Sequence, residues 1–283
     1  MKKIRYLFEA FFTYSFVGLL YLLPFETSSW LCGWLARQFG PKTRAQKVAR
    51  INLQKVFPHY TTDQINNILE KMWDNLGRNI GELPHLPKLK GKTFEKYIDF
   101  ENKVNSDIKS KFVISAHFAN WELMTLVNLE KKLGIIPVQR KMNNPYINQL
   151  LARIRRSAGT PKLIEKSTAG VKLIIKTLQN GGTVGGLMDQ RTNNGIKTSF
   201  FGFDAMTSNL PEKLHKKGVC KLMFMKCKRV DGCHSKLTIY EKKFHNKSSI
   251  TQQLNDEIQS WIEENPEQWF WVHDRWDFYK ASK

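Results

Sequence analysis

The sequence has few cysteines, no glycine or proline tract and a shortage of acidic residues. Four cysteines in 283 residues are too few for a disulfide scaffold, so we expect a reducing, cytoplasm-facing location. The 17 Gly and 10 Pro are ordinary numbers and exclude a collagen-like chain. Disorder is excluded because 41% of the residues are hydrophobic and 12% are aromatic, which is enough to form a buried core. The shortage of acid leaves 45 Lys and Arg against 25 Asp and Glu, a net charge of +20.

A charge of this size indicates an anionic partner: nucleic acid, a membrane, or an acidic protein or substrate. The excess is concentrated in two stretches. Residues 37–55 contain six Lys or Arg and no acid, and residues 210–247 contain eleven Lys or Arg against three acids. A solvated basic surface is the plain alternative for each stretch. The first stretch follows an apolar segment, which favours a membrane as the partner.

That apolar segment runs from residue 6 to residue 25 and contains one charge, Glu9. As a helix it would measure about 30 Å, the thickness of a bilayer core. No small-residue cleavage site follows it, which argues against a secretory signal. We expect a membrane-associated N-terminal helix, either a transmembrane helix or one lying in a single leaflet, with a buried core helix as the alternative. The basic stretch would then bind anionic head groups, and we divide the chain into a membrane-anchor helix region, 1–36, and an α/β domain, 37–283.

From residue 111 onward, short apolar strands alternate with amphipathic helices. Strands are predicted at 112–116, 135–138, 183–188, 221–228 and 236–244. Helices are predicted at 121–132, 145–156, 167–179 and 250–264. An earlier amphipathic helix, 61–83, begins with the capping box Thr61-x-x-Gln64, and residues 88–110 are expected to be a polar connection. The alternation predicts an α/β fold with a mixed central sheet flanked by helices.

His117 and Glu122 are the strongest candidates for chemistry. His117 directly follows the predicted strand 112–116, and α/β proteins build their sites at the carboxyl ends of strands. With His117 in the turn and Glu122 in the first turn of the next helix, the two side chains can meet. Glu122 would orient the imidazole, and the other ring nitrogen would be free to take a proton from a substrate hydroxyl. A pair with a structural role only is the alternative.

Seven blocks between residues 50 and 275 resemble, in order, the lipid A biosynthesis acyltransferases. They are Arg50-Ile-Asn-Leu53 with Phe57-Pro58, Trp73-Asp-Asn-Leu-Gly-Arg78 with Glu82-x-Pro-His85, Ser115-Ala-His117-Phe-Ala-Asn-Trp-Glu122, Gln139-Arg140 with Asn144-Pro145, Asp189-Gln190, Phe200-Phe-Gly202, and Pro266-Glu-Gln-Trp269 with Trp271-x-His273-x-Arg275. The third block resembles the catalytic His-x4-Glu motif of that family.

The resemblance implies an enzyme with a glycerolipid-acyltransferase-like fold that adds a secondary lauroyl or myristoyl chain to a lipid A precursor. The acyl group would pass from acyl carrier protein to a hydroxyl on a hydroxyacyl chain of a Kdo-bearing precursor, with His117 as the general base and Glu122 as its partner. No cofactor is implied beyond acyl carrier thioester as co-substrate. The implied partners are an acidic acyl carrier protein, the lipid A precursor and the membrane, at the cytoplasmic face of the inner membrane of a Gram-negative-type cell.

The resemblance also implies substrate-binding residues, namely Arg140, Asn144, Arg155, Asp189 and Gln190. The family arginine, carried forward from the Asn-Pro block, falls on Arg155, with Arg153 and Arg156 as close competitors. Arg155 would bind a precursor phosphate or the oxyanion, or else be a solvated helix residue. Arg140 is either a phosphate contact or part of a structural ion pair, and Asp189 either a site residue or a cap.

Two departures from the family and three alternatives stay open. Gln139 replaces the usual tyrosine, and residues 209–226 are bulkier and more basic than usual, which leaves the acyl-chain length undecided. The spacing of Cys220, Cys227 and Cys233 lacks the short pairs of a zinc site, so no metal is expected. A glycerophospholipid acyltransferase is the alternative enzyme, although it normally has Asp in place of Glu122. A nucleic-acid-binding protein would leave the apolar segment unexplained and would need a module that the sequence lacks.

Overall fold

The central sheet has seven strands in the part of the computed structural model that is described, residues 2–104, 108–159 and 162–281. The strands are β1 (Ile98–Lys103), β2 (Lys111–Ser115), β3 (Ile135–Gln139), β4 (Ile164–Glu165), β5 (Thr183–Leu187), β8 (Lys221–Asp231) and β9 (His234–Glu241). Their order across the sheet is β1-β9-β8-β2-β5-β3-β4. β8 and β9 are antiparallel, and every other neighbouring pair is parallel. The predicted α/β fold with a mixed central sheet is confirmed.

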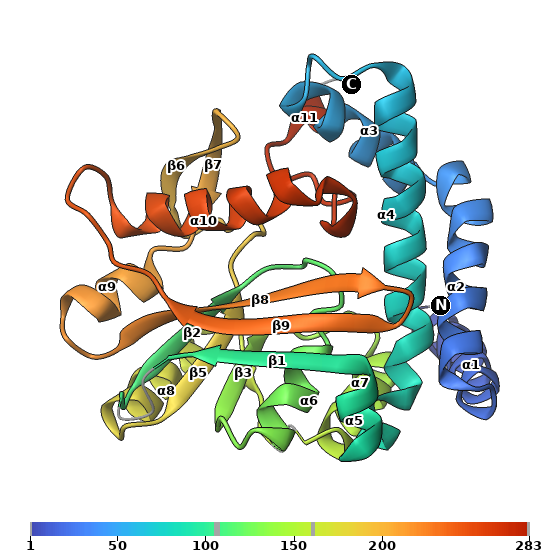
Figure 1. Cartoon of the computed structure of the whole chain (residues 1–283), viewed down its shortest axis with the longest axis horizontal. Helices are drawn as coiled ribbons and strands as arrows, with labels where there is room; N and C mark the ends of the chain where they lie inside the picture. The colour runs from blue at the N-terminus through green and yellow to red at the C-terminus, as the bar shows by residue number, and fades with distance from the viewer. Residues whose placement is uncertain (1, 105–107, 160–161, 282–283) are drawn as a thin grey trace.

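Helices lie against the sheet and across its end (Figure 1). In that view α10 (Ile250–Glu264) lies above the sheet, and α6 (Leu123–Glu130) lies below it. α4 (Thr62–Glu82) stands across one end with α2 (Phe25–Phe39) along its outer side. The other helices are α1 (Lys2–Leu22), α3 (Arg44–Val56), α5 (Lys92–Tyr97), α7 (Pro145–Ser157), α8 (Thr168–Gln179), α9 (Leu210–Lys216), α11 (Phe278–Ala281) and the 3-10 helices η1 (Gly40–Lys42), η2 (Leu83–Lys88) and η3 (Pro266–Gln268).

The sequence of β2 explains its central place. All residues of β2 after Lys111 are buried, and a parallel strand covered on both faces is a continuous apolar run. β2 lies between β5 and β8, with Ser115 opposite Leu187 of β5. The carboxyl ends of β2, β5, β3 and β4 therefore meet at one edge of the sheet, which is the position where α/β folds place ligands.

Helix α4 forms as the capping box predicts and packs unusually close to α2. Thr61 Oγ1 accepts a hydrogen bond from the backbone N–H of Gln64, and the Gln64 side chain accepts one from the N–H of Thr61. Gly77 and Gly81 bring the two helices together, because a Cβ atom at Gly81 would lie 2.3 Å from the carbonyl oxygen of Ser28 in α2. The close approach ties α2 to the body of the protein.

The apolar N-terminal segment is divided between two helices instead of forming one. α1 ends at Leu22 and α2 begins after Pro24, which has no N–H with which to continue a helix. No helix in the described residues is long and apolar enough to cross a membrane, so the predicted transmembrane helix is corrected. Charged residues occupy the first two turns of α1 up to Glu9, and the uncharged part, 10–22, would extend only about 20 Å.

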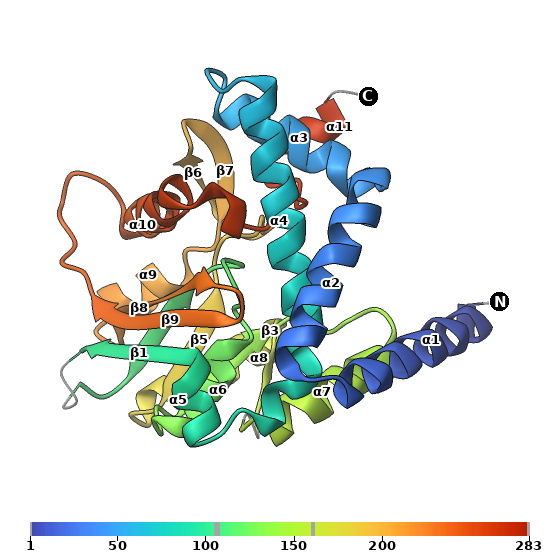
Figure 2. The same ribbon diagram turned by 45° about the vertical axis from the view of Figure 1, so that its right-hand side comes forward.

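α1 leaves the body of the molecule toward the N-terminus (Figure 2) but is anchored along its length. Asn144 donates hydrogen bonds to the backbone oxygen of Tyr6 and to the Glu9 carboxylate, both at 3.0 Å. At the other end the His85 ring is 3.0 Å from the carbonyl oxygen of Leu20. The single acid of the apolar segment is thus explained by a partner within the protein.

Several elements were not predicted from the sequence, and two groups of them matter for the sheet and its surroundings. The stretch expected to be a polar connection contains α5 and β1, an edge strand whose parallel partner, β9, lies more than a hundred residues further along the chain. β6 (Ile196–Phe200) and β7 (Phe203–Thr207) form a separate hairpin. Its turn has positive φ at Phe201 (55°) as well as at Gly202 (78°), and phenylalanine is a poor sequence signal for that conformation.

Candidate active site

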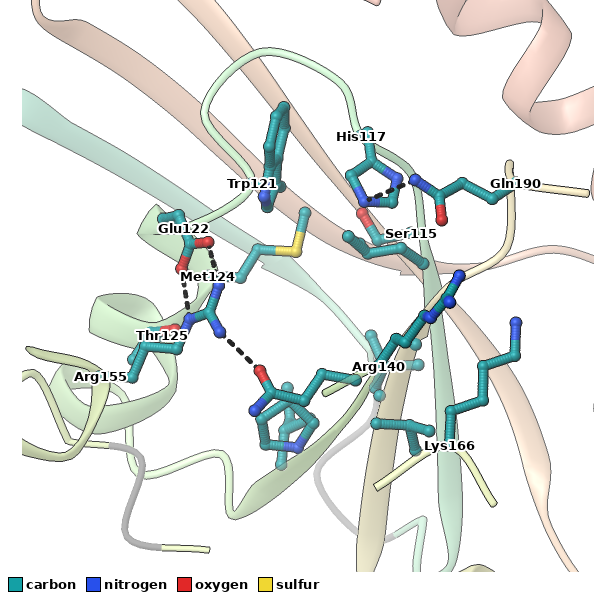
Figure 3. A pocket seen from close by; sticks show the side chains of 18 of the residues that line it. Ser115, His117, Trp121, Glu122, Met124, Thr125, Arg140, Arg155, Lys166 and Gln190 are labelled. Carbon is teal, nitrogen blue, oxygen red and sulfur yellow. Dashed lines mark hydrogen bonds and ion pairs between the residues drawn. The ribbon is translucent and has the colours of Figure 1, made fainter. Parts of the chain in front are cut away.

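A cavity of about 370 Å³ opens at the carboxyl edge of the parallel strands. Gly185 and Gly186 of β5 line it, and their lack of side chains leaves its space open. Much of the remaining wall is apolar, from side chains such as Val113, Val138 and Met225. Polar side chains surround it in three groups, namely His117 with Gln190, Glu122 with Arg155, and Arg140 with Lys166 (Figure 3). An apolar cavity with a few convergent polar groups is the usual form of a ligand site.

His117 is held by a buried aspartate. Its Nδ1 lies 2.9 Å from Oδ1 of Asp189, and its backbone N–H donates to Oδ2 at 3.0 Å. Trp269 Nε1–H donates to the same Oδ2 at 2.8 Å, and Asp189 is only 2% exposed. Burial by itself would raise the pKa of Asp189, but the charge of His117 and these hydrogen bonds lower it to about 2. Asp189 is therefore an anion at neutral pH.

The second ring nitrogen of His117 is presented to the cavity. Because the ionised Asp189 accepts the hydrogen on Nδ1, the lone pair of the neutral ring is on Nε2. The side-chain nitrogen of Gln190 is 3.4 Å from Nε2 (Figure 3), and both residues line the cavity. Trp121 meets the imidazole edge to face, with ring centres 5.0 Å apart. The arrangement orients a base whose free nitrogen can accept a proton from a bound ligand.

The predicted pairing of His117 with Glu122 is not the one that the structure contains. The Glu122 carboxylate accepts a hydrogen bond from Arg155 Nε at 2.9 Å and a second from Arg155 Nη2. Figure 3 shows the carboxylate directed at the guanidinium. A bidentate arginine matches both oxygens of a carboxylate, and Asp189 reaches His117 from the end of the neighbouring strand. Glu122 lies in the wall of the cavity as half of an ion pair.

Arg155 is the arginine that faces the cavity, as the sequence comparison with the family implied. It lines the cavity, whereas Arg153 and Arg156 are exposed on α7 and do not. Its Nη1 donates to Gln139 Oε1 at 2.6 Å. Burial would lower the pKa of Arg155, but Glu122 raises it above its ordinary value. The guanidinium is committed to two side chains of the wall and is not a free cation for a phosphate.

The other predicted substrate-binding residues are in different positions. Gln190 and Arg140 line the cavity. Asn144 does not: it is buried, and its side chain accepts hydrogen bonds from the N–H groups of Tyr146 and Ile147 at the start of α7. Asn144 is corrected from a substrate contact to a helix cap that also holds α1. Lys166 lines the cavity as well and was missed, although it stands directly before the predicted helix 167–179.

Among the described residues, no serine, threonine or cysteine side chain is hydrogen-bonded to the His117 ring. Ser115 lines the cavity, but its hydroxyl donates to the carbonyl oxygen of Met225 at 2.6 Å and not to His117. The four cysteines are buried and free, and burial raises the pKa of Cys227 to about 12. A hydroxyl on the substrate is therefore the group on which His117 can act.

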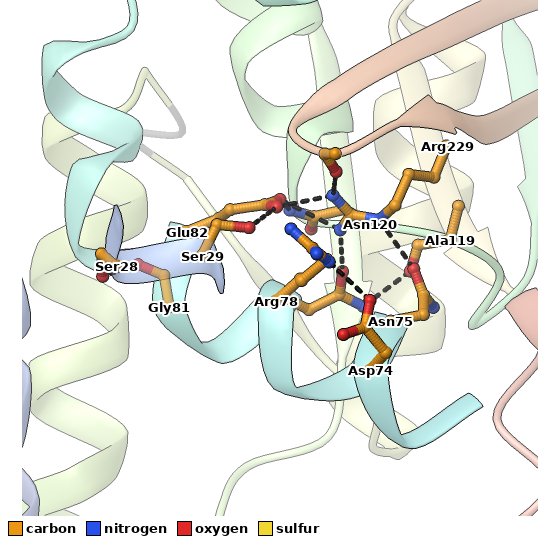
Figure 4. Close-up of polar contacts among 12 residues, drawn as sticks. Ser28, Ser29, Asp74, Asn75, Arg78, Gly81, Glu82, Ala119, Asn120 and Arg229 are labelled. Atoms are coloured by element: carbon orange, nitrogen blue, oxygen red, sulfur yellow. Dashed lines mark hydrogen bonds and ion pairs between the residues drawn. The ribbon is translucent and has the colours of Figure 1, made fainter. Parts of the chain in front are cut away.

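Behind the loop that contains His117 lies a buried polar network centred on Glu82 and Arg229 (Figure 4). Glu82 is 0% exposed and Arg229 is 9% exposed. The Glu82 carboxylate accepts from Arg229 at 2.6 and 3.1 Å, from Ser29 at 2.7 Å and from Asn120 at 2.5 Å. Burial would lower the pKa of Arg229, but Glu82 raises it above its ordinary value. Both charges are fully hydrogen-bonded, as buried ions must be.

The network extends into the loop between β2 and α6. Asn79 donates to the carbonyl oxygen of Ala119 at 2.6 Å, and Ala119 has a positive φ of 49°, which costs free energy in a residue with a side chain. Asn120, next in the chain, is held by Glu82. These contacts stabilise the turn that places His117 and Glu122 in different directions, which the spacing of the two residues does not reveal.

An oriented imidazole at the carboxyl edge of a mixed sheet, facing an apolar cavity, defines an α/β enzyme with a base at its centre. The model of the bacterial lipid A biosynthesis acyltransferases matches residues 1–277. The chain belongs to this family. It is also similar to a lipid A biosynthesis acyltransferase of Haemophilus influenzae, with 24% identity over 91% of this chain and 84% of that protein. It is thus an enzyme that transfers acyl groups in lipid A biosynthesis.

Proposed function

We propose that the enzyme moves a fatty acyl chain from acyl carrier protein to a hydroxyl of a hydroxyacyl chain on a Kdo-bearing lipid A precursor. His117 acts as the general base, and Asp189 orients it. The carrier thioester is the only co-substrate and no cofactor takes part. The reaction takes place at the cytoplasmic face of the inner membrane, where both substrates meet.

In the chemical step His117 first takes one proton from the acceptor and then gives it to the leaving group. His117 Nε2 takes the proton of the acceptor hydroxyl while the oxygen attacks the thioester carbonyl carbon. The tetrahedral oxyanion collapses, the carbon–sulfur bond breaks, and the new ester forms. The imidazolium then returns its proton to the leaving thiolate. Asp189 stabilises the imidazolium between these two events, and oriented bases of this kind contribute about 10²–10⁴-fold to a rate.

The single observation that carries this proposal is the His117–Asp189 pair at the mouth of an apolar cavity with no protein nucleophile beside it. The cavity wall offers Val113, Val138 and Met225 to an acyl chain. The basic surface is complementary to an acidic carrier protein, because opposite charges steer association. Each feature supports a hydroxyl acceptor and a long-chain acyl donor.

Transfer of a labelled acyl chain from acyl carrier protein to a purified precursor tests the proposal, with the lipid products separated by thin-layer chromatography. We expect the wild type to form the acylated precursor and His117→Ala to lose at least about 10²-fold in kcat. His59→Ala changes an exposed histidine outside the cavity and serves as the control. Transfer to a glycerophosphate acceptor alone, or full activity of His117→Ala, would overturn the proposal.

The membrane enters the proposed function through α1 and α2. Large apolar side chains on both helices are exposed, including Phe8 (65%), Phe11 (67%), Leu19 (65%) and Trp30 (54%). Basic residues occupy the first turn of α1 and follow α2. Exposed aromatic residues with flanking lysines and arginines bind the surface of an anionic bilayer. We expect more of the protein to sediment with anionic vesicles than with zwitterionic vesicles, and the anionic binding to weaken at raised salt. Equal sedimentation with both kinds of vesicle would contradict a role for the charge.

A further inference from the structure

We propose, on the basis of the acyl transfer proposed above, that Arg140 and Lys166 form a binding site for a phosphate group of one of the two substrates. The site lies at the same cavity as His117, because all three residues line it. Figure 3 shows the two side chains extending in the same direction, with their cationic ends side by side in this view.

The parallel pairing of β3 and β4 brings the two cations together. Val138 is opposite Ile164, and Gln139 is opposite Glu165. The next pair in this register is Arg140 and Lys166, just beyond the ends of the two strands. The backbone N–H of Lys166 donates to the carbonyl oxygen of Gln139 at 2.8 Å, which continues the ladder to that point. The juxtaposition is thus set by the backbone and does not depend on the side chains attracting each other.

Two like charges placed side by side repel each other, and an anion bound between them relieves that repulsion. Within residues 2–104, 108–159 and 162–281, neither Arg140 nor Lys166 has a carboxylate partner. Both side chains are exposed at the rim of the cavity, and desolvation together with the charges of Arg140 and Arg275 lowers the pKa of Lys166. The other cations that line the cavity are neutralised, Arg155 by Glu122 and Arg191 by Asp277. Arg140 and Lys166 are left as the free positive charge of the site.

The neighbouring Lys141 is a cation that does have an acidic partner. Lys141 is next to Arg140 in the chain, but its Nζ is 3.9 Å from a Glu165 carboxylate oxygen, and it does not line the cavity. The alternation of side chains along an extended backbone directs Lys141 and Glu165 away from the side on which Arg140 and Lys166 lie. The chain therefore supplies an acid to the cation outside the cavity and none to the pair inside it.

The distance from His117 fits a phosphate that is remote from the reacting atoms. Neighbouring strands are about 4.8 Å apart, and β3 and β4 lie two and three strands from β2. The pair is thus roughly 10–14 Å along the edge from the base. Arginine donates in a planar fork and lysine acts as a compact charge, and both bind phosphate oxygens strongly. The phosphate belongs either to the acceptor glycolipid or to the pantetheine arm of the acyl donor.

Kinetics with phosphate-free substrates test the site. Arg140→Ala and Lys166→Ala are each expected to raise the KM of the phosphate-bearing substrate about 10-fold, the usual effect of losing one charged hydrogen bond, with kcat within about two-fold. Lys141→Ala is the matched control and should change neither constant. Acceptor glycolipid is compared with the same lipid after removal of its phosphates, and S-acyl phosphopantetheine with S-acyl pantetheine.

The KM values decide whether the phosphate site exists and which substrate supplies the phosphate. A higher KM for the phosphorylated acceptor only, or for the phosphorylated donor only, supports the site and identifies the source of the phosphate. Unchanged KM values for both, or equal increases with the phosphate-free substrates, overturn it. Binding of radiolabelled phosphorylated acceptor and of S-acyl phosphopantetheine is measured in parallel without turnover. If the wild type binds one of them about 10-fold more tightly than both variants but transfers nothing, the acyl-transfer proposal fails while the phosphate site stands.

Discussion

Removal of one partner from the buried Glu82–Arg229 pair should destabilise the enzyme severely. In Arg229→Met the Glu82 carboxylate keeps its bonds from Ser29 and Asn120 but loses its countercharge in a site that is 0% exposed. Breaking a buried pair costs about 3–5 kcal/mol, and a domain has a total stability of about 5–15 kcal/mol. The variant should therefore lose a large part of its free energy of unfolding.

Urea unfolding, followed by circular dichroism in one fixed detergent, measures this loss. Glu82→Gln should lose a similar amount, because Arg229 then stays charged among neutral groups. The double variant should be less destabilised than the two single losses added together, since it leaves no unpaired charge. Lys197→Ala is the control: it breaks an exposed pair with Asp204, and pairs of that kind contribute little.

A loss below about 1 kcal/mol in Arg229→Met, the size of an exposed pair, would refute this reasoning. Strict additivity in the double variant would refute it too, because it would mean that the two charges do not act on each other across 2.6 Å.

Three further predictions concern other parts of the molecule. Burial would raise the pKa of Asp189, yet His117 lowers it to about 2. The ionised Asp189 therefore stabilises the fold above pH 4, and this contribution is lost as the pH falls toward 2. The difference in free energy of unfolding between wild type and Asp189→Asn, measured with urea, should shrink by about 2 kcal/mol over that window. Gly81→Ala should lower the melting temperature by several degrees, because its Cβ meets a backbone carbonyl, whereas Gly18→Ala, with open space around it, should not. Glu122→Gln and Arg155→Gln should be strongly non-additive in kcat/KM, and additivity would show that the pair does not act as a unit.

Much of the sheet could be predicted from local pattern, because its strands are short apolar runs between amphipathic helices. The strands at 112–116, 135–138 and 183–188 agree with β2, β3 and β5 to within a residue at each end. β1 was not predicted, because it pairs with a strand far along the chain and a half-exposed edge strand has no continuous apolar run.

Most of the predicted site residues line the cavity, but the partner of His117 was not predicted. His117 and Glu122 are close in sequence, and their spacing suggested a contact. The actual partner, Asp189, follows a different strand, and sequence spacing carries no information on which strands are neighbours. The turn at Ala119, with its positive φ, separates the two residues, and no local signal at an alanine predicts that conformation.

The count of charged residues also gave no indication that Arg229 has a structural role. Arg229 lies in the basic stretch 210–247, whose charges were expected on the surface, either solvated or facing an anionic partner, but it is buried and paired with Glu82. A count of lysines and arginines cannot distinguish a solvated cation from one in the core. The difference depends on an acid that lies on α4, far from it in the sequence.

The most direct test of the account is the proton resonance of the His117 ring N–H in ¹⁵N-histidine-labelled enzyme. The account predicts a low-field Nδ1–H signal in the wild type and in Glu122→Gln, which disappears in Asp189→Asn and in His117→Asn. A signal that survives in Asp189→Asn and is lost in Glu122→Gln would contradict the assignment of Asp189 as the partner of His117.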